Sequence, residues 1–346
     1  MKLLSSVFWV FIIFLVFGCK KEESLIEGES PPQYFYIVTS DQPNTIKLFE
    51  LNSKKVEVED VFYLKNKIKL DQISQIVEYR GILYIFQKET FKITIAYADS
   101  LIFIKNLDWS NEKRKPSSIA FANATTGFIS FENDSIVSVL DLTNFQVARE
   151  ISTKSPISYL ENVEQYIIGL SISTGLATII DSRTFSVEKA FWVGDSPLSC
   201  AYSSDKNTLF ILCAGKGKYD SSQVKTKAKI ITLSFPDFNK ALEVDLNIGS
   251  TSANDLVPTG LTVYGKYFGF ISTFSGLLRF SLSNPLQIQR YVAGEFYNLV
   301  LDSKKETLIA LARSDGQTNF FLINPVNSAI ISKHLINSNI LLVFPF

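Results

Sequence analysis

Residues 176–212, LATIIDSRTFSVEKAFWVGDSPLSCAYSSDKNTLFIL, contain the pattern that decides the fold. Short runs rich in Val, Ile, Phe and Thr alternate with polar turns, which is typical of antiparallel strands. The stretch predicts four strands, joined by turns at Asp181–Thr184, Gly194–Pro197 and Ser203–Asn207. A single sheet of this kind cannot bury both of its faces, so several copies must pack against one another.

The same rhythm runs through residues 33–346 in seven copies, at a spacing of roughly 43 residues that is typical of propeller blades. We therefore predict an all-β fold, a seven-bladed β-propeller of four-stranded antiparallel blades. The first copy lacks an innermost strand and has its outer strand at about Val56–Leu64, whereas Asn339–Phe346 have no hairpin after them. The C-terminal strand is therefore expected to join blade 1 and close the ring, which removes an exposed sheet edge.

The charge balance limits the classes of partner. The chain has 34 Lys and Arg residues against 34 Asp and Glu residues, so it has no overall field to attract a polyanion. Nucleic acid, whose binding depends on neutralising phosphates, is therefore not an expected partner.

The N-terminus has the features of an export signal. Lys2 is followed by an apolar run, Val7–Phe17, which is too short to span a bilayer comfortably, so residues 1–18 are interpreted as a signal peptide. Residues 19–32 are polar and contain a Pro pair, and they are expected to form a flexible tether. A plain signal peptide or an N-terminal anchor helix is the alternative interpretation.

Val16-Phe17-Gly18-Cys19 resembles the lipobox of bacterial lipoproteins, and the charged patch Lys20–Ser24 resembles the export signal of surface lipoproteins in the Bacteroidota. These resemblances imply that Cys19 is acylated, becomes the new N-terminus and anchors the protein in the membrane. The alternative for the charged patch is a solvated start to the linker.

The central copies resemble the YVTN repeat, a family of bacterial β-propellers. Asp141–Thr143 and Asp181–Thr184 match its turn between third and fourth strands, Gly194–Pro197 its connection between blades, and Ser203–Asn207 its first hairpin. The resemblance implies a lipid-anchored protein of the outer membrane and cell surface, similar to the propellers that accompany TonB-dependent transporters. Such a protein acts as a binding or docking module, and its expected partner is a TonB-dependent outer-membrane barrel.

Catalytic chemistry has few candidate residues. His334 is the only histidine, so neither a metal site built on histidine nor a serine–histidine nucleophile is expected, and we predict no catalytic residue, metal or cofactor. The alternative is a propeller hydrolase or lyase that uses carboxylates at the central channel, and a purely structural subunit is the second alternative. Cys200 and Cys213 lie on neighbouring predicted strands, where they form either a disulfide or two buried thiols.

One face of the propeller is the expected site of binding. The loops between second and third strands, and those between blades, open on the same face at the mouth of the channel. The longest is the insertion Ala214–Lys229, whose lysines and Tyr219 are interpreted either as a basic lid over an anionic ligand or as a solvated loop. Trp109 is interpreted either as an exposed aromatic platform for a small molecule or glycan, or as packed against its own blade. The candidate binding residues on this face are Trp109, Lys115, Lys154, Asp195, Lys216, Lys218, Tyr219, Glu295 and Tyr297.

Overall fold

The computed structural model describes residues 33–40, 45–88, 90–246, 255–282, 284–302 and 305–344. Internal contacts divide the chain into two units, residues 1–32 and residues 33–346. The predicted signal peptide, the tether and Cys19 lie outside the described residues.

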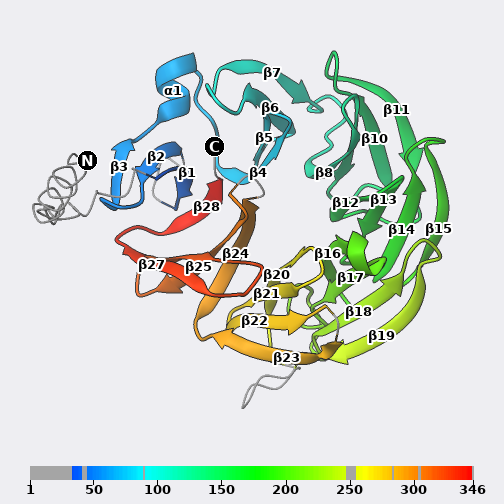
Figure 1. Cartoon of the computed structure of the whole chain (residues 1–346). Coiled ribbons are helices and arrows are strands. Elements are labelled where there is room, and N and C mark those ends of the chain that lie inside the picture. The colour runs from blue at the N-terminus through cyan, green and yellow to red at the C-terminus, as the bar shows by residue number, and fades with distance from the viewer. Residues whose placement is uncertain are drawn as a thin grey trace, which may run out of the picture. The chain divides into compact units, whose positions relative to one another are not determined.

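Residues 33–346 form a seven-bladed β-propeller, in which every blade is a four-stranded antiparallel sheet (Figure 1). From the innermost strand outward, the blades are β28 (Ile340–Phe344), β1 (Tyr34–Thr39), β2 (Ile46–Glu50), β3 (Lys55–Val58); β4 (Ile73–Tyr79), β5 (Ile82–Gln87), β6 (Lys92–Tyr97), β7 (Phe103–Asp108); β8 (Pro116–Asn123), β9 (Thr126–Phe131), β10 (Ile136–Asp141), β11 (Gln146–Ser152); β12 (Tyr159–Val163), β13 (Tyr166–Leu170), β14 (Leu176–Asp181), β15 (Ser186–Trp192); β16 (Pro197–Ser203), β17 (Thr208–Cys213), β18 (Lys229–Ser234), β19 (Asn239–Asp245); β20 (Pro258–Tyr264), β21 (Phe268–Thr273), β22 (Gly276–Ser281), β23 (Asn284–Val292); and β24 (Glu295–Asp302), β25 (Thr307–Ser314), β26 (Gln317–Ile323), β27 (Ile330–Ile336). The predicted fold class and blade number are confirmed.

The hydrophobic core lies in the seams between blades. Seven clusters of buried side chains occur among the described residues, and each draws on two neighbouring blades. Ile167 and Ile168 of β13 show why: successive strand residues point to opposite faces, so Ile167 joins the seam with blade 3 and Ile168 the seam with blade 5. Because both faces of every blade are apolar, no blade can leave the ring without exposing two seams.

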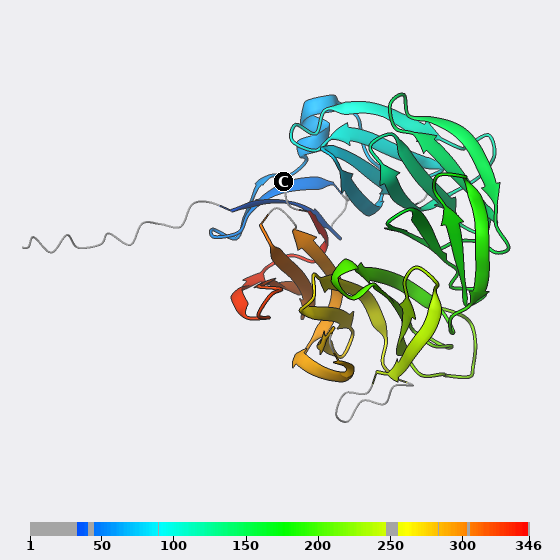
Figure 2. The same ribbon diagram turned by 45° about the vertical axis from the view of Figure 1, so that its right-hand side comes forward.

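The ring closes as the sequence predicts. Strand β28 pairs antiparallel with β1, with Tyr36 opposite Phe344 and Ile37 opposite Val343. Figure 2 shows the C-terminal end of the described chain beside blade 1. Ile340 and Val343 pack into the seam between blades 7 and 1, and Phe344 packs into the seam between blades 1 and 2. The last strand therefore belongs to two seams at once.

The predicted outer strand of blade 1, Val56–Leu64, is wrong in its second half. Strand β3 ends at Val58, and the helix α1 (Val61–Asn66) follows. Asp60 caps this helix, because its carboxylate accepts a hydrogen bond of 2.9 Å from the Tyr63 amide, and Phe62 is fully buried in the seam between blades 1 and 2. Among the described residues, no helix is long and apolar enough to cross a membrane.

Cys200 and Cys213 are free and buried. In the ladder between β16 and β17, Cys200 lies opposite Ile211 and Cys213 lies opposite Pro197, so the two cysteines are diagonal to one another. Burial raises the pKa of both thiols, that of Cys213 to about 12. Of the two alternatives, the structure has the pair of buried thiols.

Candidate binding site at the mouth of the central channel

The inner strands share a β-bulge at the ends that open on the channel-mouth face, the face formed by the loops between second and third strands and between blades. In six blades one extra residue interrupts the ladder between the first and second strands. A bulge bends its strand and re-aims side chains. The extra residues are Ser74, Ser117, Leu198, Thr259, Tyr297 and Leu341.

Three of these bulged residues tie one blade to the next. The Ser117 hydroxyl donates to the Ser158 carbonyl at 3.2 Å, and the Thr259 hydroxyl donates to the Phe296 carbonyl at 3.0 Å. The Tyr297 hydroxyl donates to the carbonyl of Ile340. Each bond crosses to the following blade, either to its inner strand (Phe296, Ile340) or to the residue just before that strand (Ser158), so the bulges fix the rim of the channel mouth.

Sequence reasoning missed these bulges, although a signal is present. Pro116, Pro197 and Pro258 each occupy the first position of an inner strand, followed two residues later by Ser or Gly. Proline has no amide hydrogen to donate to a ladder and therefore favours the start of a strand or a bulge.

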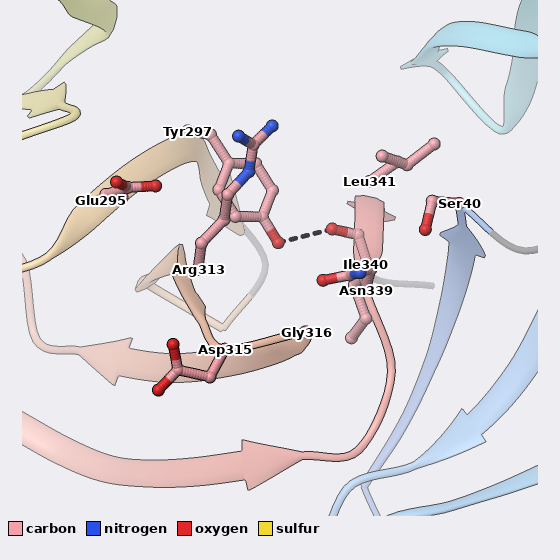
Figure 3. A pocket seen from close by; sticks show the side chains of 9 residues that line it. All are labelled: Ser40, Glu295, Tyr297, Arg313, Asp315, Gly316, Asn339, Ile340 and Leu341. Carbon is pink, nitrogen blue, oxygen red and sulfur yellow. Dashed lines mark hydrogen bonds between the residues drawn. The ribbon is translucent and has the colours of Figure 1, made fainter.

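A pocket of about 370 Å³ lies on this face where blade 7 meets blade 1 (Figure 3). We call it the blade 7–1 pocket. It brings together Glu295 and Tyr297, two of the predicted binding residues, with side chains that the sequence did not single out. Its polar lining residues are Ser40, Glu295, Tyr297, Arg313, Asp315 and Asn339.

Tyr297 is the fixed part of this pocket. Its hydroxyl is held by the Ile340 carbonyl and lies 3.3 Å from the Thr318 hydroxyl, which in turn accepts a hydrogen bond from the Ile340 amide. Burial raises the pKa of Tyr297, so the phenol stays protonated at physiological pH. The ring is thereby fixed at the seam where the propeller closes.

Arg313 lies beside this ring. Its guanidinium carbon is 5.6 Å from the centroid of Tyr297 and 5.8 Å from the centroid of Phe274, a side chain that is 40% exposed in the loop of blade 6. Such contacts over aromatic faces orient a guanidinium without consuming its hydrogen-bond donors. The Arg313 side chain makes no hydrogen bond or ion pair with any of the residues that the structure describes.

The insertion after β17 reaches across the channel-mouth face. The Tyr219 hydroxyl donates to the Pro258 carbonyl of blade 6 at 2.5 Å. Tyr219 and Asp220 also line a second pocket, of about 310 Å³, together with Ser117 of blade 3 and Ser158 of the connection to blade 4. The tip of the insertion therefore lies near the inner strands of blades 3 and 4, and Tyr219 attaches it to the inner strand of blade 6.

The lysines of the insertion are paired within the protein. Lys216 lies 3.9 Å from Asp195, Lys225 lies 3.1 Å from Asp255, and the Lys218 ammonium donates to the carbonyls of Ala214 and Thr226 at 2.7 and 2.6 Å. Burial lowers the pKa of Lys218. Asp195 also accepts a hydrogen bond of 3.0 Å from the Thr226 hydroxyl. The insertion is therefore less basic toward a ligand than its sequence suggests.

Trp109 forms no exposed platform, which corrects the first interpretation of this residue. It is 5% exposed, and its ring lies 5.2 Å from Phe131 at an interplanar angle of 72°. The partner belongs to blade 3, and the cluster that buries the indole also contains residues of blade 2, so the indole fills the seam between its own blade and the next.

The remaining candidates line neither pocket, although Glu132, the partner of Lys115, lines the second one. Lys115 forms an ion pair of 3.2 Å with Glu132. Lys154 is exposed in the connection between blades 3 and 4 and has no ion pair among the described residues. In the described part of the chain, no group of three or more His, Cys, Asp or Glu side chains is placed to hold a metal ion.

These features define a class of protein: a closed seven-bladed β-propeller with a polar, partly covered channel mouth. Solved propellers are similar to it in fold. The chain matches the Neurospora crassa Pan2 WD40 domain with a TM-score of 0.59 and 11% identity, over 81% of this chain and 85% of that one. It matches the Myceliophteria thermophila Cps50 (Swd1) propeller domain with a TM-score of 0.56 and 11% identity, over 77% and 87%.

It also matches a chain of Kuenenia stuttgartiensis hydrazine synthase, with a TM-score of 0.54 and 12% identity over 73% and 83% of the two chains. Identities this low show a common fold and nothing about activity. Neither a protein-family model nor a curated protein matches the sequence.

Proposed function

We propose that the chain is a lipid-anchored outer-membrane protein of the YVTN-repeat type, exposed at the cell surface, whose propeller binds rather than catalyses. In this proposal Cys19 carries the lipid, residues 19–32 form the tether, and the channel-mouth face captures a ligand or docks on a TonB-dependent barrel. The binding role rests on the position of the insertion of blade 5. Its Tyr219 hydrogen-bonds to the Pro258 carbonyl of blade 6, and its tip lines a pocket at the channel mouth.

The structure supports this role through the arrangement of that face. Loops that cover a concave site on a rigid scaffold are typical of binding proteins. Both pockets combine polar and apolar side chains, which come from strand ends and loops of two blades in the first pocket and three in the second. A ligand seated there would be contacted from several sides, whereas the blade seams, filled by apolar side chains, offer no such surface.

A hydrolase or lyase is the second candidate, and one observation favours it. Burial raises the pKa of Glu161, on the inner strand β12, to about 7, and carboxylic acids with such values are often general acids. Glu161, however, accepts a hydrogen bond of 2.6 Å from Tyr159 and lines neither of the two pockets at the channel mouth. Its geometry therefore favours a structural role.

The test is where the native protein is located in the cell and which proteins co-purify with it. We expect the wild-type chain to fractionate with outer membranes, to incorporate labelled palmitate and to co-purify after crosslinking with a barrel protein in near-equal amounts. The Cys19→Ser variant should lose the label and should no longer fractionate with outer membranes, because that attachment requires the acylated cysteine. Palmitate incorporation that persists in Cys19→Ser would contradict the lipid anchor, and a wild-type protein recovered free of any barrel would contradict the docking.

A further inference from the structure

The blade 7–1 pocket holds opposite charges that do not neutralise each other. Glu295 and Arg313 are direct partners in the ladder between β24 and β25. The two side chains nevertheless form no ion pair: the guanidinium lies beside the ring of Tyr297 (Figure 3). It also lies beside the ring of Phe274, and Glu295 remains exposed. Asp315, in the turn after β25, adds a second exposed carboxylate.

These groups restrict the chemistry of a ligand. A guanidinium is a donor only and an ionised carboxylate is an acceptor only, so a ligand that satisfies both must offer acceptors and donors on neighbouring atoms. A simple anion would meet the repulsion of Glu295 and Asp315, and a simple cation would meet the repulsion of Arg313. A hydroxyl both donates and accepts without carrying charge.

The other lining groups fit the same class of ligand. The Asn339 amide and the Ser40 hydroxyl each supply a donor and an acceptor at the blade 1 side of the pocket. Phe274 does not line the pocket, but it places an exposed apolar ring beside Arg313. Aromatic faces beside a few convergent polar groups are typical of small-molecule pockets.

We propose that the blade 7–1 pocket binds a neutral sugar residue, whose adjacent hydroxyls accept hydrogen bonds from Arg313 and donate them to Glu295. This assignment rests on the proposed function, since it names the ligand class for the face that captures a ligand. Arg313 and Glu295 determine specificity, and Tyr297 positions the guanidinium through its fixed ring.

The test measures sugar binding to the full chain in detergent by calorimetry. The probes are glucose, galactose, mannose, N-acetylglucosamine, maltose and lactose, with glycine and inorganic phosphate as a zwitterion and an anion. We expect at least one sugar to bind, and we expect Arg313→Ala and Glu295→Gln each to weaken that binding by about tenfold or more, because each removes a hydrogen bond to a charged group.

Arg149→Ala is the matched control. Arg149 also lies beside an aromatic ring, 4.7 Å from the centroid of Phe185, but on the outer strand β11 of blade 3. This variant should bind the sugar within about twofold of wild type, and thermal unfolding confirms that all variants are folded.

Two results would overturn the assignment: no sugar binds, or Arg313→Ala binds the sugar as tightly as wild type. In the first case, Arg313-dependent binding of glycine or phosphate would assign the pocket to a zwitterion or an anion instead. The proposed function is judged separately. If no sugar binds but the barrel co-purifies, only the ligand class is wrong; if a sugar binds and no barrel is recovered, only docking is wrong.

Discussion

A chain that ends at Ser338 is expected to have no stable folded monomer. The missing strand β28 buries Ile340, Val343 and Phe344 across two seams. Burial of each large apolar side chain contributes about 1.5–3 kcal/mol, so the three together are comparable to the whole stability of many domains, about 5–15 kcal/mol. The truncation also unpairs β1 along one edge, which favours pairing with another chain.

Circular dichroism during thermal unfolding and light scattering measure this effect. A chain that ends at Phe344 keeps the entire strand and is the control. Because the truncated chain can fail to fold at all, a synthetic peptide of residues 337–346 is added in trans, and it should restore a cooperative transition. A truncated chain that stays monomeric and melts at the wild-type temperature would show that β28 does not close the ring.

Glu161→Gln is expected to stabilise the protein at pH 8 and to leave it unchanged at pH 4. Glu161 lies on the inner strand of blade 4 beside Tyr159, whose hydroxyl donates to the carboxyl at 2.6 Å and lies 3.4 Å from the Cys200 carbonyl. Burial raises the pKa of Glu161 to about 7, and the Tyr159 hydrogen bond opposes that rise.

Proton linkage gives the sign of this change in stability with pH. Between the usual glutamate pKa of about 4.3 and the folded value of about 7, the native state holds a proton that the unfolded state has lost, so stability falls as the pH rises through this window. Glutamine keeps the acceptor for Tyr159 and carries no charge, so we expect a gain of about 2 kcal/mol at pH 8.

Chemical unfolding of wild type and variant from pH 4 to pH 8 measures this difference. Glu164→Gln, at an exposed position in the following turn, is the matched control and should not change the pH profile. Equal stabilities of wild type and Glu161→Gln at both ends of the range would mean that Glu161 is ionised at no cost in the folded protein.

Much of the fold could be predicted because it follows from local patterns. Alternating apolar residues specify strands, and the missing first strand together with Asn339–Phe346 specifies how the ring closes. The helix α1 was not predicted because it has only six residues, too few for a helical period to appear in the sequence. The capping residue Asp60 was the one sequence feature that marked its start.

The candidate site depends on the pairing between strands, which is why it was predicted only in part. Glu295 and Tyr297 could be placed on the channel-mouth face because they follow the connection between blades 6 and 7, at the start of β24. Arg313 joins them only through the ladder that sets it opposite Glu295, and Phe274 comes from another blade. The sequence could not decide between the two interpretations of Trp109, because the ring that it contacts, Phe131, is on the next blade.

The central claim is that the protein acts through its channel-mouth face, and photo-crosslinking from two opposite faces tests it most directly. A photoreactive residue replaces either Lys154, exposed on the channel-mouth face, or Lys206, exposed in the turn between β16 and β17 at the other end of the blade. In cells of the source organism, we expect a crosslink to an outer-membrane barrel from position 154 and none from position 206. A crosslink from position 206 alone, or none from either position, would contradict it.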